Sequence, residues 1–88
     1  GPYAVLATVR LPVPMEQALR SVPATVGLHR ADGPDATVVE IGGSSAEGLA
    51  RYLFSLATPL RVLAPDSVRE ELLRRTRELT AANEEAST

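Results

Sequence analysis

Few side chains in this sequence could carry out catalysis. The chain contains one histidine, His29, and no cysteine, so it offers no thiolate nucleophile and no cysteine-based zinc site. The acidic pairs Glu70-Glu71 and Glu84-Glu85 are sequence neighbours, whose side chains diverge on a helix, so they do not form a carboxylate dyad. We expect no catalytic residue, no metal site and no cofactor, and we expect His29 at the surface or rim of the fold.

A glycine-serine stretch from Gly42 to Ser45 could bind phosphate, because the free N–H groups at a helix N-terminus attract anions. The stretch lacks the lysine of a P-loop and the glycine spacing of a dinucleotide-binding fold. Ser44 and Glu47 have the spacing of a capping box, in which each side chain bonds the other residue's free backbone N–H. We therefore interpret the stretch as the start of a helix.

The charge of the chain argues against binding nucleic acid over a broad surface. All nine basic residues are arginine, eleven residues are acidic, and the formal charge is −2. A protein that binds nucleic acid by bulk charge is normally basic, so any contact with an anion must be local. Arg69, Arg74, Arg75 and Arg77 are mixed with glutamates, which predicts a solvated helix face; the alternative is a helix that docks on a partner.

Hydrophobic periodicity predicts an α+β fold. Alternation with period two indicates strands over Tyr3–Leu11, Thr25–Arg30, Ala36–Ile41 and Leu60–Ala64. Helical spacing indicates helices over Met15–Val22, from Ser44 to Leu56, and from Pro65 to near Asn83, the last with a capping box at Ser67 and Glu70. The order is βαββαβ plus a terminal helix. It predicts a ferredoxin-like sandwich, with two helices on one face of a four-stranded antiparallel sheet in the order 4-1-3-2.

The length of 88 residues predicts one small domain. We interpret residues 1–2 as the remnant of a cleaved expression tag, residues 3–83 as the domain, and residues 84–88 as a frayed tail. No apolar run reaches the length of a membrane-spanning helix. The lack of cysteine fits a cytoplasmic protein, and arginine without lysine beside abundant alanine is typical of GC-rich bacterial coding.

The sheet is expected to bury only one face. The side chains assigned to the helix side are Val5, Ala7, Val9, Val26, Leu28, Val39, Ile41, Leu60 and Val62. The side chains assigned to the opposite face are Leu6, Thr8, Arg10, Thr25, His29, Val38, Glu40, Arg61 and Leu63. This mixture of apolar and charged residues is typical of a face that something covers, either the third helix folding back or a partner.

Arg10 and Arg61 are the candidate ligand- or partner-contact residues on that face. In the predicted sheet, the end of the first strand lies beside the start of the fourth, so the two arginines lie close together. Like charges across a sheet are unfavourable. Either Glu40 or solvent offsets them, or an anionic group of a ligand, a nucleic acid or another domain does. Arg30, at the end of the second strand, is expected in solvent.

The stretch "LARYLFSLATPLRVLAPDSVREELLRRTREL" resembles the C-terminal extension, called WCX, of bacterial WYL-domain transcription regulators. The shared pattern places Leu49-x-Arg51-Tyr52-Leu53 before a strand that ends Val62-Leu63-x-Pro65, followed by a helix that begins at Val68. Upstream, "VLATVRL" and "ATVVEIGG" resemble the family's strands, so the similarity covers nearly all of residues 3–82. Tyr52 stands where the family usually has tryptophan.

The resemblance implies a non-catalytic module with a ferredoxin-like fold. It implies as partners the WYL and winged-helix domains of the same regulator, a homodimer, and a nucleic-acid effector acting through the full-length protein; no membrane partner is expected. In this role the module relays effector binding to DNA binding.

The alternative is an ACT-like domain, which shares the βαββαβ order and senses a small molecule at a glycine-bearing loop such as Gly42-Gly43. Acylphosphatase-type hydrolysis on the same fold lacks a matching arginine-asparagine pair.

Overall fold

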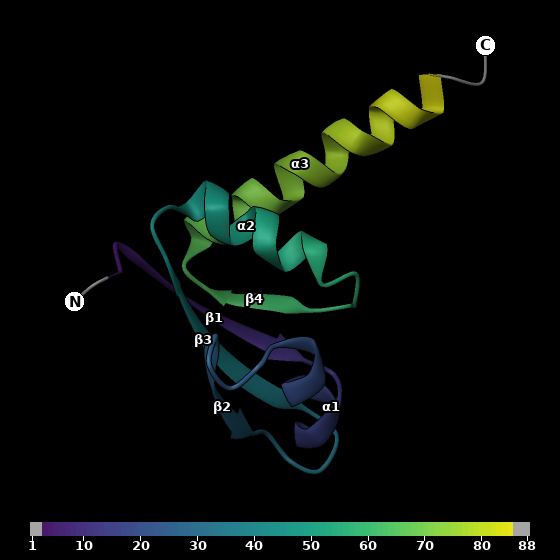
Figure 1. Ribbon diagram of the computed structural model, residues 1–88. Helices are drawn as coiled ribbons and strands as arrows, with labels where there is room; N and C mark the ends of the chain where they lie inside the picture. The colour runs from purple at the N-terminus through teal and green to yellow at the C-terminus, as the bar shows by residue number, and fades with distance from the viewer. Residues whose placement is uncertain (1–2, 86–88) are drawn as a thin grey trace.

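The computed structural model describes residues 3–85; the expected tag remnant at residues 1–2 and the last three residues, 86–88, of the expected tail 84–88 lie outside the described residues. The described chain forms four strands and three helices (Figure 1). In chain order they are β1 (Val5–Leu11), α1 (Met15–Ser21), β2 (Gly27–Ala31), β3 (Thr37–Gly43), α2 (Ala46–Ser55), β4 (Arg61–Ala64) and α3 (Asp66–Glu85).

The strands form one antiparallel sheet in the order β2-β3-β1-β4. β1 therefore lies between β3 and β4, as predicted. α1 and α2 pack on the same face of the sheet, where their buried residues join one core. The prediction of an α+β, ferredoxin-like fold with an extra C-terminal helix is confirmed.

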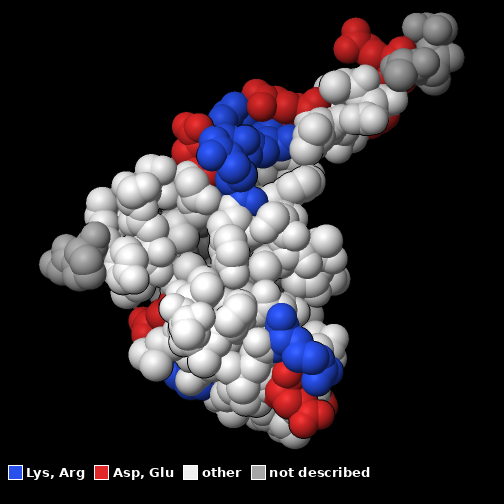
Figure 2. All heavy atoms as spheres, viewed as in Figure 1, with Lys and Arg blue, Asp and Glu red and all other residues white. Residues whose placement is uncertain are grey.

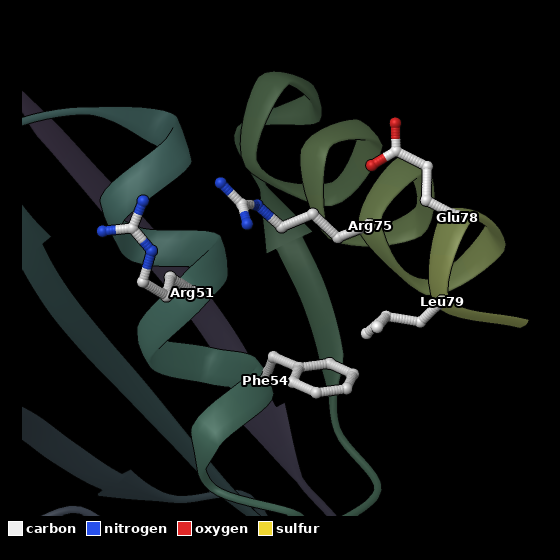
Figure 3. Close-up of a pocket in the computed structure, with 5 residues that line it drawn as sticks. All are labelled: Arg51, Phe54, Arg75, Glu78 and Leu79. Carbon is white, nitrogen blue, oxygen red and sulfur yellow. The ribbon is translucent and has the colours of Figure 1, made fainter. Parts of the chain in front are cut away.

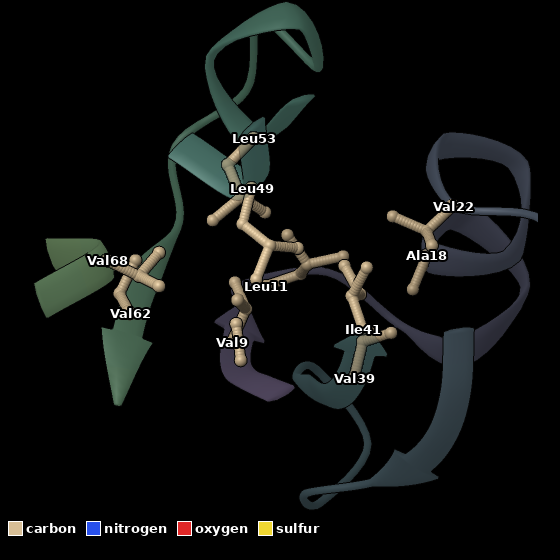
Figure 4. Packing of buried hydrophobic residues seen from close by; sticks show 11 residues of the cluster. Val9, Leu11, Ala18, Val22, Val39, Ile41, Leu49, Leu53, Val62 and Val68 are labelled. Carbon is tan, nitrogen blue, oxygen red and sulfur yellow. The ribbon is translucent and has the colours of Figure 1, made fainter. Parts of the chain in front are cut away.

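The core lies between this sheet face and the helices (Figure 4). Val9 is the register partner of Val39 on β3 and of Val62 on β4, and none of the three is more than 5% exposed. The helices contribute Ala18, Val22, Leu49, Leu53 and Val68 to the same cluster. Burial of apolar surface, at about 25 cal/mol per Å², is the main favourable contribution to folding. The inward residues predicted for β1, β3 and β4 are confirmed, with Val5 and Leu60 only partly buried.

The prediction of which β2 side chains face the helices is wrong by one residue. His29 is the register partner of the buried Val39, so it faces the helix side, whereas Leu28 pairs with Glu40 on the opposite face and is 70% exposed. Val26, also assigned to the core, is 42% exposed and precedes the strand. β2 is an edge strand of five residues, and its helix side is closed partly by β3 side chains: a methyl group on Gly27 would lie 2.6 Å from Val39 Cγ1. The strand therefore needs few large apolar residues of its own.

Both predicted helix caps are also wrong. The pairing of β1 with β3 continues to Val5 and Gly43, which moves the start of α2 one residue along the chain. Ser45, rather than Ser44, is the N-cap, and its Oγ accepts a hydrogen bond from Gly48 N at 3.0 Å. α3 begins at Asp66, so Ser67 lies inside the helix and cannot be its N-cap.

α3 does not fold back over the uncovered sheet face. It packs against α2 and β4 on the helix side of the sheet, where Val68 is fully buried and Leu72 partly buried. Its later turns point away from the body of the domain (Figure 1), and residues 76–85 are all exposed. The helix was expected to end near Asn83, but it continues through Glu85.

A pair of matched substitutions tests the placement of β2. Leu53→Ala removes a side chain that is 1% exposed, and we expect it to lower the free energy of unfolding by about 2–5 kcal/mol. Leu28→Ala removes the same atoms from a site that is 70% exposed, and we expect a change within about 0.5 kcal/mol. Urea denaturation measures both. A large loss of stability for Leu28→Ala would contradict the register of β2.

Candidate functional site

Three arginines form one row across the sheet face that is opposite the helices, here called the open face. Arg10 on β1 is the register partner of Arg61 on β4 and of Val38 on β3, and Val38 is the register partner of Arg30 on β2. Register partners project from the same face, and adjacent strands are about 4.8 Å apart. The predicted closeness of Arg10 and Arg61 is therefore confirmed. Arg30 is exposed, as expected, and it joins the same row.

The counter-ion of Arg10 is Asp32, not Glu40. Arg10 Nε donates a hydrogen bond to Asp32 Oδ2 at 2.8 Å, and Asp32 lies in the turn that follows β2. Glu40 is the partner of Thr8 and Leu28, one row farther along the strands. Within residues 3–85, Arg61 takes part in no ion pair. The row is thus only partly neutralised inside the domain.

An apolar groove continues the open face beyond the arginine row. Leu28 is 70% exposed, Tyr3 62% and Leu6 54%, and with Gly42 they line a groove of about 410 Å³. A methyl group on Gly42 would lie 2.5 Å from the ring of Tyr3, so the glycine allows this ring to lie against the strand backbone. The open face therefore has a basic end and an apolar end.

Val38 is buried, although it belongs to the open face. It is 2% exposed, and its two register partners are Arg10 and Arg30. Arginine can lay its aliphatic stem on an apolar neighbour and keep the guanidinium in water. Arg10 and Arg30 flank Val38 on the two neighbouring strands, so their stems are the side chains best placed to cover it.

A second hollow lies between α2 and α3 and is here called the α2–α3 cleft (Figure 3). Its volume is about 280 Å³, and its lining residues are Arg51, Phe54, Arg75, Glu78 and Leu79. The side chains of Phe54 and Leu79 point toward each other, and each is about half exposed. The sequence analysis did not identify this cleft.

The first half of α3 carries a network of ion pairs, and arginines and acids gather there on the surface (Figure 2). Arg74 bonds Glu71 at 2.6 Å and Glu78 at 2.8 Å, and Arg75 bonds both Glu71 and Glu47, so it links α3 to α2. The predicted charged helix face is therefore present and mostly exposed.

Hydrogen bonding from Arg74 lowers the pKa of Glu71 below its ordinary value. A lowered carboxylate pKa stabilises the folded state above the unfolded-state pKa, and this contribution is lost as the pH falls through the folded-state pKa. Exposed pairs of this kind contribute little each.

His29, which faces the helix side, has a hydrogen bond between Nδ1 and the Gly27 carbonyl at 3.1 Å. Its Nε2 is buried and has no partner among the described residues. Within residues 3–85, no group of three or more histidine, aspartate or glutamate side chains could hold a metal ion. The described part of the chain also has no helix that is both long and apolar enough to cross a membrane.

The fold and the two surfaces define a small α+β domain of the ferredoxin-like class with one sheet face left uncovered. The model of the WCX domain family matches residues 3–80, and the chain belongs to this family. The resemblance seen in the sequence is thereby confirmed. Neither a curated protein nor a solved structure matches the chain.

Because Arg10 and Arg61 carry like charges on adjacent strands, we expect Arg61 to lower the stability of the isolated domain. Arg61→Gln removes the repulsion with Arg10, and we expect it to raise the free energy of unfolding by about 0.2–1 kcal/mol at low salt. The gain should shrink in concentrated salt, which screens exposed charges. Arg51→Gln is the control, because Arg51 has an ion pair with Glu47 at 3.3 Å and should gain nothing. A loss of stability for Arg61→Gln at low salt would mean that Arg61 has a stabilising partner within the chain.

Proposed function

We propose that this chain is the non-catalytic regulatory module of a WYL-type, helix-turn-helix transcription regulator, and that it relays effector binding to DNA binding through protein contacts, including those of a homodimer. Membership of the WCX family supports the coarser part, since WCX domains are C-terminal regulatory extensions of WYL regulators. In this proposal, a nucleic-acid effector acts through the full-length protein.

The open face is the observation that carries the proposal. It combines exposed apolar side chains with an arginine row in which Arg10 and Arg61 repel each other. Charged groups confer specificity and orientation on a contact, and apolar groups at its centre contribute affinity. A surface that is mixed in this way suits another protein domain, and we assign it to the WYL and winged-helix part of the same regulator.

A binding experiment in trans tests this assignment. The isolated chain is titrated into a regulator fragment that contains the winged-helix and WYL domains but lacks the WCX domain. We expect Arg61→Glu to lower the affinity at least about tenfold, because it reverses a charge inside the contact. Arg20→Glu is the matched control, since Arg20 is an exposed arginine on α1, on the other side of the sheet. Equal binding by both variants would remove the open face from the proposal.

An ACT-like sensing role is the second candidate. A hollow of about 270 Å³ lies beside Gly42 and Gly43 and is lined also by Leu49 and Tyr52. However, packing explains both glycines: Tyr3 lies over Gly42, and a methyl group on Gly43 would lie 2.7 Å from Leu49 Cγ.

A thermal-shift screen separates the two functions. We expect none of the proteinogenic amino acids to raise the melting temperature of the isolated chain, because a ligand stabilises only a protein that binds it in the folded state. A saturable increase with one amino acid would favour the sensing role. Short single-stranded DNA is included in the screen, and we expect the isolated chain to show no shift with it either.

A further inference from the structure

Glu40 lies near the centre of the open face. It belongs to β3, which lies inside the sheet, and it shares a row with Leu28 on β2 and Thr8 on β1. Two hollows of the open face meet at this residue, the apolar groove of about 410 Å³ and a smaller hollow of about 180 Å³, and Glu40 and Leu28 line both. The carboxylate therefore lies within the surface that another domain would cover.

The Glu40 side chain is partly buried and has no partner within the described domain. Among residues 3–85, it takes part in no ion pair and no side-chain hydrogen bond. The two arginines one row away do not pair with it. Arg10 is bonded to Asp32 at 2.8 Å, and Arg30 takes part in no ion pair in the same part of the chain. The open face thus contains an unpaired carboxylate although basic residues lie close to it.

Water solvates this carboxylate in the isolated domain, but a domain that covers the open face removes the water. A desolvated carboxylate without a cation is strongly unfavourable, and a cation with good hydrogen-bond geometry offsets this cost. Within the open face, Arg10 is engaged with Asp32, and Arg30 is one of the two side chains best placed to cover Val38. The cation for Glu40 therefore has to come from the covering domain.

We propose that the covering domain places a basic side chain, an arginine or a lysine, opposite Glu40, with its aliphatic stem in the apolar groove beside Leu28 and Leu6. These two residue types combine an apolar stem with a cationic head. The groove matches this chemistry, since Glu40 is the one charged residue among those that line it. The inference rests on the proposed function, in which the covering domain is the WYL and winged-helix part of the same regulator, and it adds the chemistry of the contact.

Glu40 and Arg61 together define how the covering domain is oriented. Neither has an ion pair within residues 3–85, and they carry opposite charges. They lie two strands and one row apart in the sheet, which separates their Cα atoms by about 12 Å. A domain that presents a basic and an acidic group at this spacing satisfies both residues, whereas the same domain turned around meets like charges, which is unfavourable.

Titration of the chain into the winged-helix and WYL fragment tests the pairing through the sign of one effect. Glu40→Gln keeps the size of the side chain and removes its charge. We expect the affinity to fall at least about tenfold, mainly through faster dissociation, as when one member of a buried charge pair is truncated. A carboxylate covered without a cation would give the opposite result, because the variant removes the cost of desolvating a charge. Equal or tighter binding by Glu40→Gln would therefore overturn the proposal.

A second variant and a matched control complete the titration. Glu40→Leu should weaken binding more than Glu40→Gln, because it leaves the partner's cation without a hydrogen-bond acceptor; tighter binding by Glu40→Leu would contradict the pairing. Glu16→Gln is the control, since Glu16 is an exposed glutamate on α1, on the helix side of the sheet, and its binding should equal that of the wild type. Because the Glu40 side chain has no partner in the described domain, neither Glu40 variant is expected to lower the melting temperature of the isolated chain.

The same titration separates failure of this inference from failure of the proposed function. A fragment that does not bind the wild-type chain would overturn the proposed function and the Glu40 pairing with it. Binding that Arg61→Glu weakens and Glu40→Gln leaves unchanged would keep the open-face contact and overturn the Glu40 pairing alone.

Discussion

The contact of Val9 with Val39 and Val62 across three adjacent strands is the constraint on which the rest of the structure depends. It closes the helix side of the sheet and sets the register of β1 with both neighbours. Because side chains alternate along a strand, a residue committed to the core sends its neighbours to the other face. Arg10 is therefore on the open face because Val9 is in the core. A slip of one residue would bury an arginine and expose a valine, so the core and the arginine row are specified together.

The arginine row is a local feature of an acidic chain. The formal charge of the whole chain is −2, and exposed charges are screened beyond about 8–10 Å at physiological salt. A partner therefore interacts with the few charges nearest to it rather than with the net charge. Asp32 pairs with Arg10, while Arg61 keeps its charge uncompensated within the described residues. This arrangement favours a contact whose specificity comes from the positions of individual charged groups.

The sequence predicted side-chain orientation correctly where the alternating pattern is long and the strand lies in the middle of the sheet. β1 and β3 are seven residues long, so their inward faces followed from alternation, and the closeness of Arg10 to Arg61 followed from alternation together with the predicted strand order. The prediction for β2 failed because a short edge strand contributes few side chains to the core. The hydrophobicity of its residues therefore does not reveal which of its faces points inward. The hairpin contained a better signal: Ala31 pairs with Thr37 across the turn, and counting back from the inward Val39 gives an inward His29. The α2–α3 cleft depends on how two helices lie in space, which local patterns do not determine.

The two surfaces lie on opposite sides of the same sheet, and one short segment connects them. Arg61 is the first residue of β4, and α3 begins at Asp66, directly after that strand. β4 is also an edge strand, held to the sheet only by β1, while Val62 and Val68 carry the contact of this segment with the core. A partner that moves β4 by binding the open face would move the base of α3, and a long helix amplifies a small rotation at its base into a larger shift at its end. Coupling of two sites requires a physical element that both of them bias. In the proposed function, the β4–α3 segment is the direct covalent connection between the open face and the α2–α3 cleft.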